Sequence, residues 1–316
     1  MKRAPYFVLF TAILAVAASQ DPAPPQQAAG RGGRGGFGGP IVLGPDDKPA
    51  FPDPPAGFNT KREQVPHGEL TPVEYDSKSL GTRRRMRVYT PPGYSTNRKY
   101  PVLYLLHGIG GTDTEWTEAC HANHVIDNLL AEGRIQPMVL VFPDGNSART
   151  VADLAAGGRG AGAGARGGAG RMGMDAWLTP FENDLLKDII PYVDSHYSVY
   201  SDRDRRALAG LSMGGGQALN IGLVHPETFA WVGGFSSAPD TRQPPSALVP
   251  DPTVPKQLKL IWLACGNKDG LIRISQAVHG YLKENGVPHI WHVDGNAHDT
   301  TEWDNNLYLF SQRIFK

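Results

Sequence analysis

Cysteine is scarce in this sequence, which has only Cys120 and Cys265 among its 316 residues. Two thiols cannot form a disulfide scaffold, so the fold has to be stabilised by a hydrophobic core. A single bridge between Cys120 and Cys265 is the alternative in an oxidising compartment, but we expect both thiols to be free and mostly buried. The chain also lacks net charge, because 31 basic residues balance 31 acidic ones. Without an excess of either sign, nucleic acid and anionic membrane surfaces are not favoured as partners.

Long hydrophobic runs are lacking too. The apolar run at residues 6–16 follows a basic M-K-R start and leads into small residues at 15–19. This run is too short to span a bilayer, whereas a basic start, an apolar middle and a small-residue end are typical of a secretory signal peptide. The sequence therefore predicts a signal peptide over residues 1–19, a secreted or periplasmic protein, and no membrane partner after cleavage.

Glycine and proline, in contrast, are abundant, with 38 and 27 residues, and many of them fall in two stretches. Residues 20–59 are rich in Pro, Gly, Gln and Ala, which predicts a flexible linker. Within them, R-G-G-R-G-G-F at 31–37 is similar to the RGG segments of RNA-binding proteins, but a biased linker fits an exported protein better. Residues 157–173, mainly Gly, Ala and Arg, predict a mobile surface insert. The remaining residues, 60–316, are predicted to form one domain.

Strand patterns in this domain alternate with helical spacing. Residues 69–75 and 83–89 are typical of an antiparallel edge pair, whereas the continuous apolar run at 101–106 is typical of a parallel strand buried on both faces. Further strands are expected at residues 138–142, 206–211, 231–235, 258–264 and 289–293. Such a pattern predicts an α/β fold, in which a mostly parallel sheet with antiparallel N-terminal edge strands has helices on both faces.

Five segments between and after these strands show helical spacing, at residues 118–132, 179–190, 213–223, 274–285 and 303–314. Thr179 is expected to cap the second segment, with Pro180 as its first helical residue. Pro191 is expected to end or kink it. In a sheet of this kind, ligands bind at the carboxyl ends of the strands.

The sequence G-L-S-M-G at 210–214 lies between an expected strand and an expected helix. In a strand, sharp turn and helix arrangement, the serine occupies the strained apex, and the glycines leave room for the close approach of neighbouring backbone. A serine hydroxyl is a weak nucleophile, so it needs a base, and the base needs a third group to orient it. Ser212 is therefore the candidate nucleophile.

The candidate base and acid follow from the order Ser, acid, His that is expected on a hydrolase sheet. His298 lies in a short glycine-containing loop after the last strand, which makes it the candidate base. Asp269 lies in the loop after the preceding strand and is the candidate orienting acid. Asp294 and Asp299, both close to His298 in sequence, are its competitors.

The negative oxygen of a tetrahedral intermediate needs two preplaced donors, each worth roughly 3 to 4 kcal/mol. The Met213 N–H is the first, because it follows the serine at the positive end of a helix. The second is assigned to Ile109 N–H in the glycine loop 107–111, with Gly110 as the near alternative. His107 is expected to position this loop.

Candidate substrate-binding residues lie in the same loop and in nearby aromatic positions, namely Gly108, Gly110, Trp116, Trp177 and Trp303. The H-x-x-H pair His121 and His124 lacks a third ligand. We therefore expect neither a metal nor a cofactor, and the sequence does not set an oligomeric state.

Several motifs together resemble the secreted α/β-hydrolase esterases of carbohydrate esterase family 1 and the esterase D group, which include feruloyl and acetylxylan esterases. They are L-L-H-G-I-G-G at 105–111, F-E-N-D-L at 181–185, G-L-S-M-G-G-G at 210–216, G-G-F-S at 233–236 and C-G at 265–266. The resemblance covers residues 67–316. It implies an α/β-hydrolase fold, the same three catalytic residues and an oxyanion hole from both loops.

The implied function is that of an exported serine esterase that hydrolyses feruloyl or acetyl esters of plant-derived carbohydrate, a small molecule or a polysaccharide. A siderophore-ester hydrolase or an acyltransferase on the same fold, and a non-catalytic binding protein, are the alternatives. The sequence departs from the family pattern in the insert at 157–173, where related enzymes shape the substrate cleft.

Overall fold

The structure is a computed structural model, which describes residue 1 and residues 40–148, 175–238 and 240–316. The predicted signal peptide beyond Met1, the first part of the predicted linker and the insert at 157–173 lie outside these ranges. Within the described ranges, no helix is both long and apolar enough to cross a membrane. Both cysteines are free and buried, as predicted.

The described residues form an eight-stranded sheet in the order β1-β2-β4-β3-β5-β6-β7-β8. The strands are β1 Glu69–Ser77, β2 Thr82–Thr90, β3 Val102–Leu106, β4 Val139–Pro143, β5 Arg206–Leu211, β6 Trp231–Phe235, β7 Leu260–Gly266 and β8 Ile290–Asp294. Strand β2 pairs antiparallel with β1 and β4, and the other neighbours are parallel. The mostly parallel sheet with antiparallel N-terminal edge strands is thereby confirmed.

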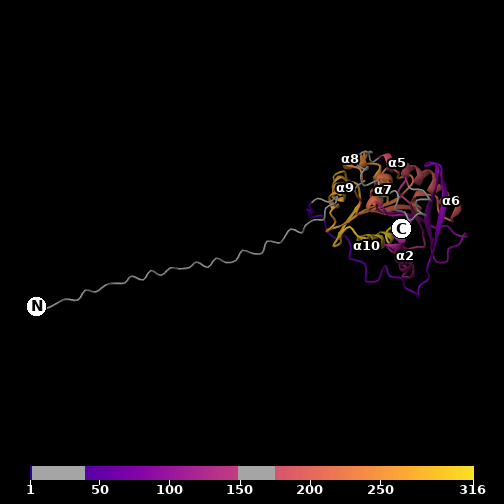
Figure 1. The fold of residues 1–316 in the computed structure, drawn as a ribbon, viewed down its shortest axis with the longest axis horizontal. Helices are drawn as coiled ribbons and strands as arrows, with labels where there is room; N and C mark the ends of the chain where they lie inside the picture. Colours follow the sequence, from indigo (N-terminus) through magenta and orange to yellow (C-terminus); the bar gives the residue numbers. More distant parts are fainter. Residues whose placement is uncertain (2–39, 149–174, 239) are drawn as a thin grey trace. The chain divides into compact units, whose positions relative to one another are not determined.

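Helices cover both faces of the sheet (Figure 1). They are α1 Glu115–Glu118, α2 Ala122–Ala131, α5 Asp175–Asp184, α6 Ile190–His196, α7 Ser212–Gly222, α8 Pro245–Leu248, α9 Ile272–Glu284 and α10 Thr300–Ser311. In β3, Val102, Tyr104 and Leu106 join a core cluster with α5, α6, α7 and α9. Leu103 and Leu105 join a second cluster with α1, α2 and α10. The central strands are apolar throughout because both of their faces are buried.

Two helices differ from the sequence prediction. The helix expected over residues 118–132 begins at Ala122 instead, as α2, because His121 before it has a left-handed φ of +47°; a separate short helix, α1, ends at Glu118. The helix expected to begin at Thr179 and Pro180 begins at Asp175 instead, so Pro180 lies inside α5. Leu178 and Phe181 are buried in the core, and this packing outweighs the hydrogen bond that proline cannot donate.

Pro191 does not end the helical segment. A π-helical turn, Leu185–Ile189, follows α5, and the chain continues as α6, with Pro191 in its first turn. Proline is tolerated in the first turn of a helix, and π-helical hydrogen bonding occurs mostly as a single turn within a longer helical segment.

Residues 44–59, which we call the N-terminal strap, contain no helix or strand, yet they pack against the domain. Phe51 stacks on Trp262 with ring centroids 5.5 Å apart, and the Asn59 amide donates to Asp304 at 2.6 Å. The structure therefore differs from the predicted boundary at residue 60: the packed part of the chain includes the second half of the predicted linker.

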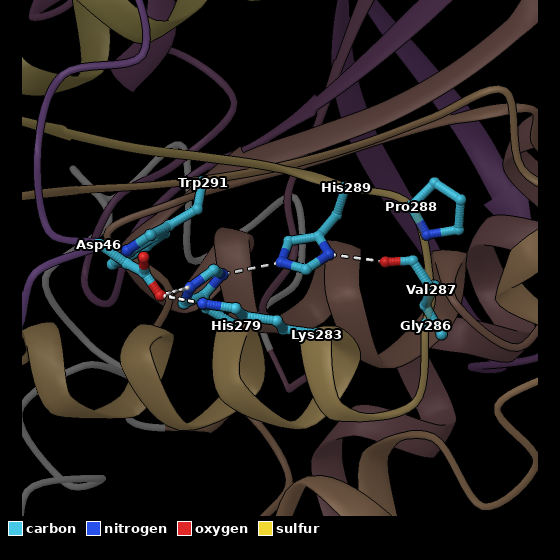
Figure 2. Close-up of a pocket in the computed structure, with 8 residues that line it drawn as sticks. All are labelled: Asp46, His279, Lys283, Gly286, Val287, Pro288, His289 and Trp291. Carbon is cyan, nitrogen blue, oxygen red and sulfur yellow. Dashed lines mark hydrogen bonds and ion pairs between the residues drawn. The ribbon is translucent and has the colours of Figure 1, made fainter.

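The strap is attached to α9 beside a surface cavity of about 510 Å³ (Figure 2). Lys283 Nζ lies 2.5 Å and His279 Nε2 3.4 Å from the same Asp46 oxygen. His279 Nδ1 is in turn 2.8 Å from His289 Nε2. None of the predicted catalytic residues lines this cavity, so its polar groups serve to attach the strap.

Candidate active site

Ser212 lies where β5 meets α7, and its backbone is in the left-handed region with φ of +50°. A non-glycine residue rarely adopts this conformation, which is typical of a serine presented on a sharp turn. A Cβ on Gly214 would overlap the carbonyl of Leu106, and one on Gly210 would overlap the backbone of Gly214. The G-x-S-x-G spacing thus lets the turn pack closely against the end of β3.

The structure brings Ser212, His298 and Asp269 together from three loops. His298 Nε2 lies 2.9 Å from Ser212 Oγ, and His298 Nδ1 lies 2.7 Å from Asp269 Oδ2. Because a carboxylate only accepts, we assign the ring proton to Nδ1, which leaves Nε2 to accept the proton of the serine. The sequence order Ser, Asp, His thus becomes a continuous hydrogen-bonded series.

Asp269 is the carboxylate that contacts His298, and its two competitors form hydrogen bonds with other groups. Asp294 accepts from the backbone and side-chain nitrogens of Asn296. Asp299 caps α10 by accepting from the backbone N–H groups of Thr301 and Glu302.

The buried carboxyl group of Asp269 is stabilised in its ionised form by its neighbours. Burial acts to raise the pKa of Asp269, but the hydrogen bond and charge of His298 and the Leu271 N–H outweigh it and hold the pKa below its usual range. Cys265 Sγ lies 3.4 Å from Asp269 Oδ2. Burial raises the pKa of that thiol well above its usual range, so Cys265 is a neutral donor beside the carboxylate.

The glycine loop lies beside the serine. A Cβ on Gly108 would be 3.4 Å from Ser212 Cβ, and the Gly108 N–H donates to Glu115 Oε2 at 2.7 Å. His107 is buried, with Nδ1 2.7 Å from the Gly108 carbonyl and Nε2 3.0 Å from Asp144 Oδ1. These contacts anchor the loop, so His107 holds it in place and does not face Ser212 as a second base.

The two predicted oxyanion donors belong to segments that meet at this point. Met213 is the second residue of α7, directly after Ser212. Ile109 follows Gly108 in the loop, and its side chain is 60% exposed. Gly110 has φ of +79°, which a residue with a side chain rarely adopts. An aligned pair of N–H groups near a nucleophile is what a tetrahedral oxyanion requires.

The tryptophans predicted to bind substrate have different environments. Trp116 is 1% exposed and donates through Nε1 to the Leu106 carbonyl, so the prediction that it contacts substrate is wrong: it is a core residue. Trp303 is half-buried, and its ring lies edge-on to His298 at 5.3 Å. Trp177 lies in α5, and its side chain is outside the described part of the structure.

Two residues near Asp269 were not found from the sequence. Ser236 follows β6 with φ of +50°, and Glu302 lies in the first turn of α10; both are fully buried. The Ser236 hydroxyl acts to lower the pKa of both Asp269 and Glu302, although neither Ser236 Oγ nor Glu302 Oε2 has a hydrogen-bond partner within the described ranges. The available signal for Glu302 was its place three residues after Asp299, the N-cap of α10, since an acidic residue at this position is typical of a helix start.

Metal-ligating groups do not cluster in the described ranges: no set of three or more His, Cys, Asp or Glu side chains is placed to hold a metal ion. His121 and His124 stack on each other at 5.8 Å without such a third partner.

Comparisons with known proteins agree with this geometry. The model of a family described as putative esterase matches residues 77–308. An endo-1,4-beta-xylanase/feruloyl esterase of Xylanibacter ruminicola is 32% identical over 265 residues, which is 82% of this chain and 33% of that protein. An esterase of Mycobacterium tuberculosis is 29% identical over 170 residues, 54% of this chain and 32% of that protein. The chain thus spans about a third of the length of these relatives.

Solved structures show the same fold. A ferulic acid esterase of carbohydrate esterase family 1 from Anaeromyces mucronatus, in complex with ferulic acid, has a TM-score of 0.66 and 27% identity, with 83% of this chain and 96% of that chain covered. An enterobactin esterase from Shigella flexneri has a TM-score of 0.57 and 20% identity, with 80% and 60% of the two chains covered. The latter similarity shows the α/β-hydrolase fold alone.

Proposed function

The chain belongs to the putative esterase family. From that premise we propose that it is a carboxylic ester hydrolase, namely an exported serine esterase that releases feruloyl or acetyl groups from plant-derived carbohydrate. The observation that carries the proposal is the hydrogen-bonded series from Ser212 Oγ through His298 to Asp269, with distances of 2.9 and 2.7 Å.

The proposed mechanism assigns one role to each group of this series. Ser212 Oγ attacks the ester carbonyl while His298 Nε2 takes its proton, and Asp269 stabilises the imidazolium that forms. The N–H groups of Met213 and Ile109 bind the oxygen that becomes negative. His298 then gives its proton to the leaving alkoxide. In the second half, His298 activates a water molecule that attacks the acyl-enzyme, and Ser212 is regenerated.

The proposed acyl group rests on two supports. The relatives that cover the domain include proteins named as feruloyl or ferulic acid esterases. In addition, the half-buried Trp303 lies edge-on to His298, where its ring can contact an aromatic acyl group. Export rests on the N-terminal sequence, in which a basic start and a short apolar run precede small residues.

Substitution of the nucleophile tests the mechanism. Ser212→Ala is expected to lower kcat by about five to six orders of magnitude, because the acyl-enzyme cannot form. Labelling with a fluorophosphonate should be lost in the same variant. The control is Ser275→Ala, which removes another buried serine hydroxyl, in α9, and is expected to keep both activity and labelling. Labelling that persists in Ser212→Ala would show that another residue is the nucleophile.

A substrate panel tests specificity on the wild-type protein. Methyl ferulate, acetylated xylan, p-nitrophenyl acetate and a catecholate ester should be compared by kcat/KM. We expect methyl ferulate or acetylated xylan to be preferred. A preference for the catecholate ester would favour a siderophore-ester hydrolase, and transfer to an added alcohol in place of water would favour an acyltransferase. Hydrolysis of none of the four would favour the non-catalytic alternative.

A further inference from the structure

Glu115 is a half-buried acid beside the glycine loop that has no part in the mechanism above. It is the first residue of α1, and its Oε2 accepts from the Gly108 N–H at 2.7 Å. A Cβ on Gly111 would overlap the same oxygen, so the missing side chain there leaves room for the carboxylate. A hydrogen bond to an ionised carboxylate is stronger than one between neutral groups. The acid therefore holds the glycine loop from the side of α1.

The residues on both sides of Glu115 are anchored. Trp116 is buried and donates through Nε1 to the Leu106 carbonyl at the end of β3, at 2.9 Å. The buried carboxylate of Asp113 accepts from Arg85 Nε at 2.9 Å and from Arg85 Nη2 at 2.8 Å. A planar guanidinium that forms two such bonds fixes the orientation of its partner. Glu115 is thus a fixed hydrogen-bond partner for the loop.

The loop itself is a four-residue turn from Gly108 to Gly111. The Gly111 N–H donates to the Gly108 carbonyl at 3.0 Å, and His107 Nδ1 lies 2.7 Å from the same carbonyl. Gly110, at the third position, has φ of +79°, as in a type II turn. In a trans peptide, an N–H points away from the carbonyl of the preceding residue. The Ile109 N–H therefore points away from the two groups that hold the Gly108 carbonyl.

Burial divides the N–H groups of this turn. Gly108 is buried, so its N–H needs an acceptor inside the protein, and Glu115 supplies it. Ile109 and Gly110 are exposed, and their N–H groups have no acceptor among the described residues. These two groups are therefore left for an oxygen of the substrate, as an oxyanion hole requires.

Loss of the Glu115 carboxylate would disturb this division. A buried N–H without an acceptor is costly, so the loop would turn the Gly108 N–H toward water. The peptide groups of the turn are connected, and such a movement would carry the Ile109 N–H away from its position beside Ser212.

We propose that Glu115 is a positioning residue for the oxyanion hole: it accepts from the buried Gly108 N–H and thereby directs the Ile109 N–H at the substrate oxygen. This inference rests on the proposed function. Glu115 acts through the loop and not on the reacting atoms. Because its role is that of a hydrogen-bond acceptor, a glutamine, which has an acceptor oxygen in its amide, is expected to replace it.

The experiment compares Glu115→Ala and Glu115→Gln with the wild type, using the ester that the wild type hydrolyses fastest. Glu115→Ala is expected to lower kcat about 10- to 100-fold and to keep KM within about twofold, because a misplaced donor loses transition-state stabilisation and not ground-state binding. Phenylboronic acid forms a tetrahedral adduct with a serine and serves as the transition-state probe. Its Ki should rise by a similar factor. Glu115→Gln should stay within about threefold in kcat, KM and Ki.

The control is Glu118→Ala, the same change on the same helix α1. The Glu118 side chain is 63% exposed and lies 3.4 Å from Arg87 Nη2, so kcat and Ki should stay within about twofold of the wild type. Wild-type kcat in Glu115→Ala would overturn the inference. A lower kcat with an unchanged Ki would also overturn it, because the effect would then lie outside the oxyanion hole. An equal loss in Glu115→Gln would contradict the role of an acceptor.

A second measurement does not need turnover. Hydrogen exchange, followed by mass spectrometry on overlapping peptides that resolve the Gly108 N–H, should be slow in the wild type and in Glu118→Ala. In Glu115→Ala it should be about tenfold faster or more. Fast exchange in the wild type would overturn the inference even if the protein is an esterase, and this result does not depend on the folding of any variant. If exchange is as expected and the wild type hydrolyses no ester, the proposed function fails while the contact between Glu115 and the loop stands.

Discussion

At the scale of single residues, two features of the active site depend on the backbone more than on the side chains. Ser212 and Ser236 both have φ of +50° and lie at the carboxyl ends of the neighbouring strands β5 and β6. The first presents a hydroxyl to His298, and the second places one near Asp269. Such strained positions persist only where the surrounding packing holds them.

Gly214 shows how tightly the serine turn is held. A Cβ there would overlap the carbonyl of Leu106, so Gly214→Ala is expected to push α7 away from β3 and move Ser212 out of reach of His298. A displacement of this kind should lower kcat/KM by about 100-fold or more. Kinetics and circular dichroism on the purified variant check this.

Gly280→Ala is the matched control for Gly214→Ala. Gly280 lies within α9, and a Cβ there would meet no atom within 4 Å. Alanine should therefore stabilise the helix by about 0.5–1 kcal/mol without changing kcat/KM. Wild-type activity in Gly214→Ala would contradict the close packing of the turn.

At the scale of elements, the N-terminal strap is a described segment whose structure differs from the prediction of its sequence pattern. It has the composition of a linker, yet Phe51 stacks on the ring of Trp262 and also contacts the guanidinium of Arg313, whose Cζ is 3.5 Å from the Phe51 ring centroid. The strap also uses backbone groups, since the Ala50 N–H donates to His292 Nδ1 at 3.1 Å. A segment without helix or strand can thus be held by a few aromatic and polar contacts.

Removal of the Phe51 side chain tests whether packing of the strap stabilises the domain. Phe51→Ala is expected to lower the free energy of unfolding by about 1–2 kcal/mol, because it removes a half-buried ring and its cation–π contact. Urea unfolding of the full chain measures this, and kcat should be kept because the strap does not include the triad. Val42→Ala is the control: Val42 is 73% exposed, so its change should stay within about 0.5 kcal/mol. Equal stability of the two variants would contradict a packed strap.

At the scale of the whole molecule, buried carboxyl groups make stability depend on pH. Burial raises the pKa of Asp304 from 3.8 to about 7, although the hydrogen bond from Asn59 opposes the shift. Between these two pKa values the folded state holds a proton that the unfolded state has lost. The free energy of unfolding therefore falls as the pH rises through this window.

Asp304→Asn should remove this contribution. At about pH 5 the variant and the wild type should have similar stability, whereas at about pH 8 the variant should be more stable by about 1–3 kcal/mol, because it has no charge to bury. Urea unfolding at both pH values checks this, with Asp76→Asn, an exposed carboxyl in β1, as the control. If the free energies of unfolding of Asp304→Asn and wild type change by the same amount between the two pH values, burial of Asp304 is not the cause of the pH dependence.

The strands were predictable because a buried parallel strand needs a continuous apolar run, and such a run is a local property of sequence. The candidate catalytic residues were predictable for a related reason. Ser212, Asp269 and His298 each follow an expected strand, and the carboxyl ends of parallel strands meet at one edge of the sheet. Local pattern and topology were therefore sufficient to predict that these three residues lie close together.

Burial between distant segments was not predictable in this way. Trp116 was expected at the substrate and is a core residue, because its environment depends on β3 and β6 and not on its own loop. Pro180 was expected to begin a helix and Pro191 to end or kink it. The buried Leu178 and Phe181 lie on either side of Pro180, and the buried Ile190 and Val193 belong to α6, which continues past Pro191. The preference of proline for a helix end is worth a few kcal/mol, and the packing of several buried side chains outweighs it.

The sequence by itself determined the alternating α/β pattern, the serine turn and the chain order of the three candidate catalytic residues, because these depend on neighbours within a few positions along the chain. Only the tertiary structure decided that the strap is packed, that Asp269 and not Asp294 or Asp299 contacts His298, and that Glu302 and Ser236 lie next to Asp269. Those contacts join segments up to hundreds of positions apart, and their free energy depends on burial that no local pattern contains.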